Sequence, residues 1–411
     1  MDKIAIFIAD SNGRFSVPAT KDGAVPILVE HLVEENNIHK VFNMTVVTFY
    51  NADAYEKSKQ YKNIDFVWVK VPKIIKIFDN LIYTIVKKWM KNKKAISYKS
   101  IVSLLFYILK GSFFLKKRKF DKVIFENNIP LVWIIRLSKY SGRYYYHFHN
   151  IPRIDAHCKK LFESCNGYMC VSKFVKNYIT SDESSIGKIK KEKVKVLYNC
   201  IDTNKFNNDI VEHEIDKVRK KYGIKEHENV LVFVGRLSKE KGVEKVIEAL
   251  EFINSKKVHL LITGSVMHGD NKDIDEYQEF LYQLVKKQTK KITFTGYVMQ
   301  DEVNKLYKLA DVAILPSMWE EPAGLTMIEA MACGTPLITC RSGGIEEYVR
   351  NYAVVLEKNA DVDKQIAYKV DWLLSNNIKA KEYGQKASNF VVENYNLDNY
   401  YNNFVDLLNK M

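Results

Sequence analysis

The amino-acid sequence predicts an α/β protein built from two Rossmann-like, doubly wound domains in tandem. Short apolar runs typical of buried parallel strands alternate with longer amphipathic stretches typical of helices, which is a βαβ rhythm. This rhythm ends near residue 205 and begins again after a polar, charged stretch. A chain of 411 residues with 47% hydrophobic residues has enough material for two cores.

The N-terminal half contains six candidate strands, at residues 4–8, 44–49, 66–70, 123–125, 143–147 and 168–171. We expect a helix at 27–34, directly after a turn that contains Gly23. A glycine at the first strand-to-helix turn lets a phosphate approach the backbone closely, so Gly23 is a candidate binding residue and Asp22 a weaker one.

The C-terminal half repeats the pattern, with candidate strands at residues 230–234, 260–263, 292–294, 312–315 and 337–339. The tail from Leu397 to Leu408 has apolar residues at helical spacing and needs a surface on which to bury them. We therefore expect an N-terminal domain, a C-terminal domain and a helix that crosses back, at residues 1–205, 206–392 and 393–411. Because ligands bind at the carboxyl ends of strands in doubly wound sheets, the active site is expected in a cleft between facing domains.

The basic character of the chain belongs to its N-terminal half. Residues 1–205 carry a net charge of +18, whereas residues 206–411 carry −4. The segment 70–122 holds 15 basic residues and only two acidic ones, and it includes apolar stretches too short to span a bilayer. Such a segment fits an anionic membrane surface, a core helix with a solvated lysine face, or a nucleic-acid surface. Because aromatic and aliphatic residues outnumber the polar types that read bases, we favour the membrane and expect no nucleic-acid partner.

The N-terminus and the cysteines indicate the compartment. The first residues form a strand pattern and lack the charged, apolar and small-residue regions of a secretory signal. Six cysteines without any C-x-x-C spacing favour neither a disulfide framework nor a zinc cluster. We expect a cytoplasmic protein that is peripheral on the inner face of the cell membrane.

A basic loop follows the expected strand at 230–234. Gly235 and Gly242 bound this loop, and Arg236 and Lys241 stand five residues apart within it. A guanidinium and an ammonium at this spacing can converge on one diphosphate. The alternative is a solvated basic loop, and the sequence is not a P-loop because no G-x-x-x-x-G-K-[S/T] occurs.

Two carboxylates flank a second expected turn after the strand at 312–315. Glu321 precedes a helix that opens at Gly324, and Glu329 lies inside that helix. The first backbone amides of the helix, at Leu325 and Thr326, form an anion site. This arrangement lets one acid reach a transferred sugar and the other clasp ribose hydroxyls, although a core helix with a capping acid is the alternative.

These two motifs, with Gly343-Gly344 downstream and the turn at 198–206, resemble the retaining glycosyltransferases of family 4, which have the GT-B fold and include enzymes of bacterial cell-envelope polysaccharide synthesis. The resemblance implies the following roles: Arg236 and Lys241 on the donor diphosphate, Glu321 on the donor sugar, Glu329 on the ribose, the backbone of Tyr297 and Val298 on the base, and Gly23 in a loop facing donor and acceptor. Ala323, Tyr198 and Cys200 depart from the family pattern, which puts the fine donor specificity in question.

His147 and His149 end the strand at 143–147 and lie on one face of it. An H-x-H pair can bind a metal, but no acidic or third histidine partner stands at a useful spacing. The resemblance implies a metal-independent enzyme in which His149 contacts the donor sugar. We expect His147 to be a packing residue and predict neither a metal nor another cofactor.

The predicted activity is hexosyl transfer with retention from a nucleoside-diphosphate sugar, expected to be UDP-linked, to a saccharide acceptor. The basic N-terminal surface favours a lipid-linked acceptor in capsule or cell-wall polysaccharide synthesis. A nicotinamide-dependent oxidoreductase is disfavoured because no G-x-G-x-x-G follows a strand. A non-catalytic GT-B subunit is the alternative, and the presence of Arg236, Lys241, Glu321 and Glu329 argues against it.

Overall fold

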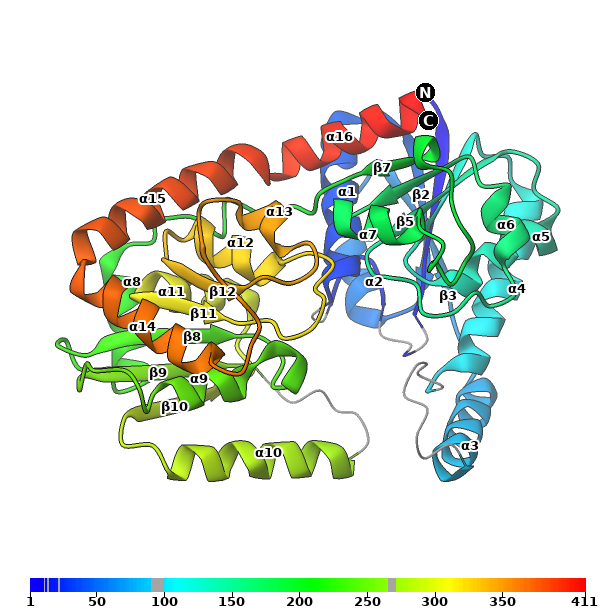
Figure 1. Cartoon of the computed structure of the whole chain (residues 1–411). Coiled ribbons are helices and arrows are strands. Elements are labelled where there is room, and N and C mark those ends of the chain that lie inside the picture. The colour runs from blue at the N-terminus through cyan, green and yellow to red at the C-terminus, as the bar shows by residue number, and fades with distance from the viewer. Residues whose placement is uncertain (11, 13–14, 21–22, 90–98, 265–270) are drawn as a thin grey trace. The chain divides into compact units, whose positions relative to one another are not determined.

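The computed structural model describes the whole chain except residues 11, 13–14, 21–22, 90–98 and 265–270 (Figure 1). It divides into two compact units. Unit 1 consists of Met1–Asn199 together with Leu397–Met411, and unit 2 of Cys200–Asn396. Each unit is built around its own parallel sheet, as the two-domain pattern of the sequence predicted.

Unit 1 contains a seven-stranded sheet in the order β3-β2-β1-β4-β5-β6-β7, and every neighbouring pair is parallel. β1 is central and almost wholly buried, which explains its unbroken apolar run. The short edge strand β7 was not predicted. The strands are β1 (Lys3–Ile8), β2 (Asn43–Phe49), β3 (Ile64–Val69), β4 (Lys122–Glu126), β5 (Arg143–Phe148), β6 (Gly167–Cys170) and β7 (Val194–Val196).

The helices of unit 1 include one from the far end of the chain. α16 (Leu397–Lys410) packs on α1 (Ala24–His39), where the Tyr401 hydroxyl donates to Asn36 Oδ1 at 2.7 Å. The C-terminal segment thus completes the core of unit 1. The other α-helices are α2 (Ala52–Ser58), α3 (Lys73–Trp89), α4 (Ile101–Lys117), α5 (Trp133–Ser138), α6 (Lys159–Glu163) and α7 (Lys173–Ile179).

Unit 2 contains a six-stranded parallel sheet in the order β10-β9-β8-β11-β12-β13. The order reverses at β8 and β11, so the loops after these two strands meet at the switch point where doubly wound sheets bind ligands. The short edge strand β13 was not predicted. The strands are β8 (Asn229–Val234), β9 (Val258–Thr263), β10 (Lys291–Gly296), β11 (Val312–Leu315), β12 (Leu337–Cys340) and β13 (Val354–Leu356).

Helices cover the sheet of unit 2, with α14 packed on α9 and α15 packed on α12. α12 begins at Leu325, directly after Gly324, where the sequence predicts that the helix opens. The helices are α8 (Glu212–Lys221), α9 (Val243–Ala249), α10 (Asn271–Lys286), α11 (Gln300–Leu309), α12 (Leu325–Ala332), α13 (Ile345–Val349), α14 (Val362–Ser375) and α15 (Asn377–Asn394).

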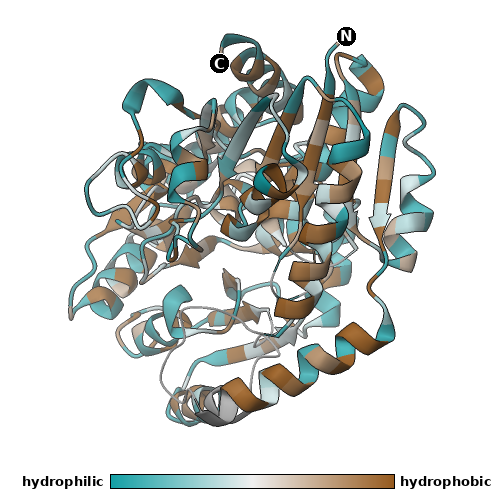
Figure 2. Cartoon of the chain, turned by 90° about the vertical axis from the view of Figure 1, so that its right-hand side faces the viewer, coloured by the Kyte–Doolittle hydropathy of each residue, from teal (hydrophilic) through white to brown (hydrophobic). Residues whose placement is uncertain are grey.

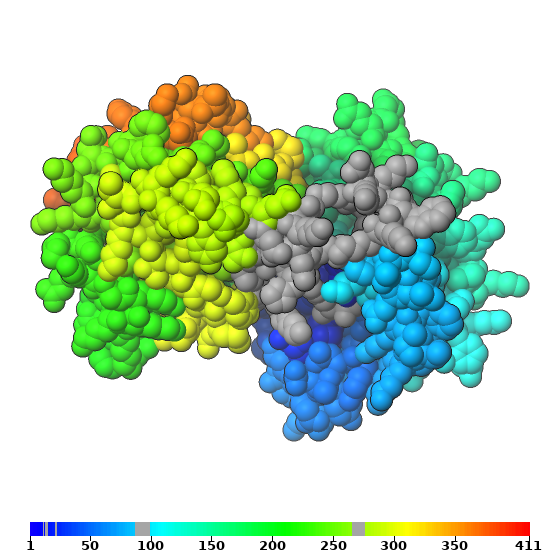
Figure 3. Space-filling view, turned by 90° about the horizontal axis from the view of Figure 1, so that it is seen from below, coloured from blue at the N-terminus to red at the C-terminus, as the bar shows by residue number. Residues whose placement is uncertain are grey.

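α3 carries an apolar face that is open to solvent. Figure 2 shows this helix as largely hydrophobic, and Figure 3 shows it at the surface of unit 1. Asp79 on the opposite side is buried and accepts hydrogen bonds from the backbone amides of Val102 and Ser103 at the start of α4, at 2.8 and 3.2 Å. The exposed side chains, each about half accessible, recur at helical spacing: Ile74, Ile77, Phe78, Leu81 and Ile85. Within the described ranges, no helix is both long enough and apolar enough to cross a membrane.

Candidate active site

The basic loop after β8 is held at the carboxyl edge of the sheet in unit 2. The Gly235 amide donates to the Thr263 carbonyl at 3.0 Å, which ties the loop to the end of β9. Gly242 has φ +70°, and a Cβ there would lie 2.4 Å from the Pro316 carbonyl oxygen. Only glycine therefore lets this loop pack against the end of β11.

Lys241 and Glu321 form the centre of the candidate site. Lys241 Nζ lies 2.5 Å from Glu321 Oε2. The same oxygen accepts hydrogen bonds from the Ser317 hydroxyl and the Trp319 indole N–H, each at 2.9 Å. The ion pair of Lys241 and Glu321 is partly buried, and it is a strong charge-assisted contact. If Lys241 turns to another anion, Glu321 still accepts hydrogen bonds from the two neutral donors.

The segment that carries Glu321 is hydrogen-bonded to the loop after β12. The Gly344 amide donates to the Glu321 carbonyl at 2.7 Å, and the Gly343 amide donates to Glu320 Oε2 at 2.7 Å. Gly343 has φ +55°, and a Cβ there would lie 2.2 Å from the Glu321 carbonyl oxygen. Burial opposes ionisation of Glu320, but Lys358 and the Gly343 amide hold the pKa of that carboxyl below its usual value. Three loops are therefore locked together around Lys241 and Glu321.

Arg236 lies in the same loop as Lys241 but makes a different contact. Its Nη2 lies 3.4 Å from Glu240 Oε2, and the side chain is 42% exposed. An exposed ion pair contributes little to stability, so an incoming anion can compete for this guanidinium. The structure thus separates the two cations, with Lys241 on Glu321 and Arg236 on Glu240.

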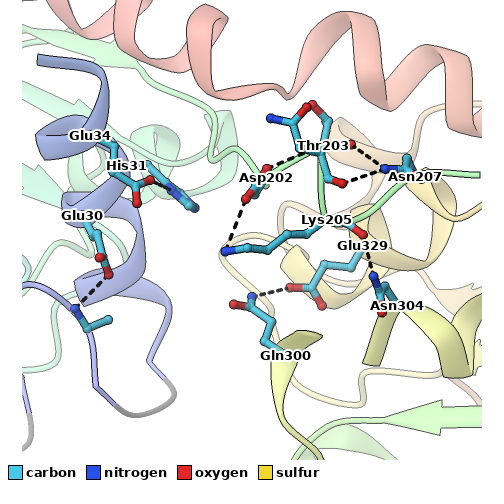
Figure 4. Close-up of polar contacts among 12 residues, drawn as sticks. Glu30, His31, Glu34, Asp202, Thr203, Lys205, Asn207, Gln300, Asn304 and Glu329 are labelled. Atoms are coloured by element: carbon cyan, nitrogen blue, oxygen red, sulfur yellow. Dashed lines mark hydrogen bonds and ion pairs between the residues drawn. The ribbon is translucent and has the colours of Figure 1, made fainter. Parts of the chain in front are cut away.

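The helix α12 presents its amino end beside this centre. Gly324 is the residue that precedes the helix, and Leu325 and Thr326 supply its first amides. Further along α12, Glu329 is buried, with Oε1 3.5 Å from Gln300 Nε2 (Figure 4). The helix end offers an anion site, and Glu329 offers a carboxylate for hydroxyl donors.

The candidate base-binding residues follow β10. The Gly264 amide donates to the Gly296 carbonyl at 3.0 Å, which joins the ends of β9 and β10. Tyr297 is half exposed, whereas Val298 is buried.

The turn at 198–206, which resembles the family's domain-closing motif, is anchored to unit 2. Asn304 Nδ2 donates to the Lys205 carbonyl at 2.7 Å (Figure 4).

Gly23 lies in unit 1, where it precedes α1 and its carbonyl accepts the Ile27 amide at 3.3 Å. The loop leading to it is tied to the same helix, because Glu30 Oε2 accepts the Ala19 amide at 2.9 Å (Figure 4). Asp22 lies outside the described residues, as do the basic residues Lys91, Lys93 and Lys94 of the segment 70–122.

His149 also lies in unit 1, and the structure gives it an acidic partner that sequence spacing did not reveal. Glu126 ends β4, next to β5, and its Oε2 lies 2.8 Å from His149 Nε2 and 3.1 Å from His147 Nδ1. The expectation that no acid accompanies the H-x-H pair is therefore wrong, because parallel pairing aligns Glu126 with His147. His147 packs on His149, with ring centroids 4.0 Å apart.

Burial and mutual charge set the ionisation of this cluster. Burial opposes ionisation of Glu126, but His147 and then His149 favour its charged form and hold its pKa at about 2. Burial first, and His147 second, lower the pKa of His149 to about 4, against the opposing effect of Glu126. At neutral pH the cluster therefore consists of a carboxylate beside a neutral His149.

Comparison with known proteins finds similarity to glycosyltransferases. Residues 214–390 match the family model described as Glycosyl transferases group 1. A protein of Methanocaldococcus jannaschii, named an uncharacterized glycosyltransferase, is 36% identical over 242 residues, which cover 58% of each chain. Spore coat protein SA of Bacillus subtilis strain 168 is 28% identical over 295 residues, which cover 68% of this chain and 76% of the relative. The chain thus matches less than two thirds of the length of the archaeal relative.

Solved structures share the fold of the entire chain. Anabaena HepE, in complex with UDP and glucose, is similar with a TM-score of 0.75 and 16% identity, covering 100% of both chains. WaaG, a glycosyltransferase involved in lipopolysaccharide biosynthesis, has a TM-score of 0.64 and 15% identity, covering 97% of this chain and 96% of WaaG. The predicted α/β fold class with two Rossmann-like domains of the GT-B type is confirmed. Residues 214–390, which match the model of glycosyl transferases group 1, carry every candidate residue of unit 2.

Proposed function

We propose that this protein is a retaining glycosyltransferase that moves a hexose from a nucleoside-diphosphate sugar to a saccharide acceptor. The observation that carries the proposal is the pair of Lys241 and Glu321, 2.5 Å apart at the end of β11, inside the region that matches the family model. HepE was solved with UDP and glucose, which supports a UDP-sugar as the first donor to test.

The donor diphosphate would take the cations from their present partners. Lys241 would turn from Glu321 to the phosphate, while Ser317 and Trp319 continue to hold that carboxylate for the sugar hydroxyls. Arg236 would exchange its exposed contact with Glu240 for the diphosphate, and the amides of Leu325 and Thr326 would add the helix N-terminus. Glu329 would accept hydrogen bonds from the ribose, and the backbone of Tyr297 and Val298 would contact the base.

The main catalytic effect in this proposal is electrostatic stabilisation of the departing nucleoside diphosphate. As the glycosidic bond to the leaving phosphate breaks, negative charge grows on the phosphate oxygen next to Lys241 and Arg236. That oxygen can take the proton of the acceptor hydroxyl while the acceptor oxygen forms the new bond to the anomeric carbon on the same face of the sugar, which gives retention without a carboxylate nucleophile. The two cations supply the positive charge, so we expect transfer to proceed without a metal ion.

The acceptor side of the proposal rests on unit 1. α3 packs on α4 through the side opposite its exposed apolar face, and α4 carries exposed Leu105, Leu109 and Phe113 and ends at Lys117, within the basic run 116–119. Apolar side chains next to cations are suited to an anionic membrane surface. We propose that unit 1 docks there and that the acceptor is a lipid-linked saccharide of capsule or cell-wall synthesis.

The direct test is a thermal-unfolding screen of the purified chain across nucleoside diphosphates and their hexose conjugates. A ligand that binds only the folded state raises the melting temperature with the logarithm of its concentration. We expect UDP and one UDP-hexose to give the largest rise, followed by release of UDP from that donor in the presence or absence of a chelator. A donor that stabilises the chain but is never hydrolysed or transferred would favour the non-catalytic alternative, and stabilisation by none would overturn the proposal.

A further inference from the structure

Three metal-ligating side chains meet where the end of α1 packs against the start of α16. Glu35 and His39 lie four residues apart on α1, and Asp398 lies in the first turn of α16. His39 Nε2 lies 3.3 Å from Glu35 Oε2 and 3.9 Å from Asp398 Oδ1. One ligand atom of each residue lies within 4.8 Å of the other two. The sequence did not indicate this cluster, because only the packing of α16 brings Asp398 to α1.

Glu35 is a buried carboxylate that faces a second carboxylate. It is only 8% exposed, and in the described part of the chain its carboxylate has no polar partner apart from His39 and Asp398. Burial of a charge is unfavourable unless an opposite charge compensates it, and a nearby like charge adds to the cost. One imidazolium balances one carboxylate, whereas a divalent cation balances both and leaves the imidazole neutral for ligation.

The electrostatics of the helix ends accounts for only two of the three side chains. An acid in the first turn of a helix and a histidine in the last turn both interact favourably with the helix dipole, which suits Asp398 and His39. Glu35 lies one turn before the carboxyl end of α1, where a negative charge gains nothing from the helix. Its burial against Asp398 therefore needs another cause.

The distances within the cluster suit zinc. Two ligand atoms that lie about 2.1 Å from a tetrahedral Zn²⁺ are about 3.4 Å apart. The distance from His39 Nε2 to Glu35 Oε2, 3.3 Å, is close to this value, and the exposed Asp398 can close its 3.9 Å by a small rotation of its side chain. A nitrogen ligand beside two carboxylates favours Zn²⁺ over Mg²⁺ and Ca²⁺, which take oxygen ligands.

The imidazole of His39 is both oriented and accessible. Its ring stacks on Tyr401 of α16, with centroids 5.7 Å apart and planes inclined by 17°. Tyr401 is fixed in turn by its hydrogen bond to Asn36. The side chains of His39 and Asp398 are 48% and 75% exposed, so an ion can enter from solvent although Glu35 is buried.

We propose that Glu35, His39 and Asp398 form a zinc site that fastens α16 to α1, with water completing the coordination. The site lies at the opposite end of α1 from Gly23, about 24 Å along the helix axis. The zinc would stabilise the docking of the C-terminal helix and take no part in transfer. The inference therefore does not depend on the proposed function.

Calorimetric titration of the metal-free full chain with ZnCl₂ at pH 7 tests the site. The six cysteines are buried in the folded chain, so they do not compete for the ion. We expect one Zn²⁺ per chain, with binding weakened more than about 100-fold in His39→Gln or Asp398→Asn, because each loses a ligand and even outer-shell changes cost about 10–100-fold. No binding by the wild type, or equal binding by both variants, would overturn the proposal.

His31→Gln is the matched control. His31 also pairs with a glutamate of α1, at 3.2 Å from Glu34 Oε2 (Figure 4), but among the described residues this pair has no third ligand of the histidine, cysteine or carboxylate type beside it. We expect this variant to bind zinc as the wild type does. Loss of zinc in His31→Gln with retention in His39→Gln would place the ion at the wrong pair and overturn the assignment.

Hydrogen exchange of the folded chain shows whether the ion fastens α16. At a free zinc concentration of ten times Kd, any local opening that breaks the site should become about tenfold rarer. We expect exchange in α16 to slow by this factor in the wild type but not in Asp398→Asn, with α14 of unit 2 as an unchanged reference. Zinc that binds without slowing α16 would overturn the fastening role. An equal slowing by Mg²⁺ would overturn ligation by His39.

Discussion

Lys241 Nζ lies 2.5 Å from Glu321 Oε2, so the cation expected on the diphosphate is paired with the acid expected on the sugar. The two residues are 80 positions apart in the sequence and meet because the loops after β8 and β11 adjoin at the centre of the sheet. This pairing sets the first prediction, because removing either partner should affect donor chemistry more than the fold.

Lys241→Ala should lower kcat about 10²–10³-fold, the usual effect of removing one group that stabilises transition-state charge. The fold should survive because Ser317 and Trp319 still donate to Glu321. Lys245→Ala is the matched control, since Lys245 is similarly exposed and pairs with Glu248 at 2.7 Å on α9. Turnover measurements that find Lys241→Ala as active as the control would show that Lys241 does not serve the leaving group.

Gly343→Ala should destabilise unit 2 and weaken donor binding together. The added Cβ would meet the Glu321 carbonyl oxygen at 2.2 Å, in a left-handed backbone with φ +55°. Gly223→Ala is the control, because its φ is +62° but its nearest neighbour is the tip of Lys291 at 3.9 Å. The control should lose only about 1 kcal/mol from its left-handed backbone. Equal losses of unfolding free energy in Gly343→Ala and Gly223→Ala would mean that the close packing of Gly343 against the Glu321 carbonyl does not stabilise unit 2.

Glu329→Gln should raise KM for the donor about tenfold and change kcat little. A hydrogen bond from ribose to a carboxylate is worth about 1.5–3 kcal/mol, and it holds the donor equally in the ground and transition states. Glu302→Gln, which removes an exposed carboxylate paired with Lys221, serves as the control in the same steady-state assay. A fall in kcat at unchanged KM would assign Glu329 to the chemistry instead.

The free energy of unfolding should fall as pH decreases from about 6.5 to about 4 because of His149. Its pKa in the folded chain is about 4, below the ordinary 6.5, so the unfolded chain binds this proton more readily in that window. Glu126 adds a further loss of unfolding free energy below pH 4.5, because its pKa in the folded chain is about 2 and the unfolded chain therefore binds this proton first. In urea unfolding, the wild type should lose on the order of 2 kcal/mol more than His149→Gln between pH 6.5 and 5. His213→Gln changes an exposed histidine, so between pH 6.5 and 5 it should lose as much unfolding free energy as the wild type.

Ile77→Asp with Leu81→Asp should abolish binding of the chain to vesicles that contain phosphatidylglycerol. Each burial of such a side chain contributes about 1.5–3 kcal/mol, so the double change should weaken binding by more than about 100-fold. Ile378→Asp is the control, at a side chain of unit 2 that is 78% exposed. Co-sedimentation at low salt tests this, and a wild-type chain that stays in solution would contradict docking through α3.

The sequence predicts most of this fold because each central strand is a continuous apolar run, as in β1 and β11. It does not reveal β7 and β13, since each has three residues at a sheet edge and is defined by pairing with β6 or β12. The loop of Lys241 and the turn of Glu321 were predictable from local motifs. Glu126 was not, because its relation to His149 comes from parallel register between strands 21 residues apart in chain position.

The packing of α16 on α1 means that unit 1 is assembled from both ends of the chain. Asn36 can accept the hydrogen bond from the Tyr401 hydroxyl only after residues 200–396 have been synthesised. During translation, unit 2 can therefore fold from a continuous stretch while unit 1 still lacks its last helix. We expect nascent chains to resist protease first in unit 2, with unit 1 gaining protection only once α16 is free to pack on α1.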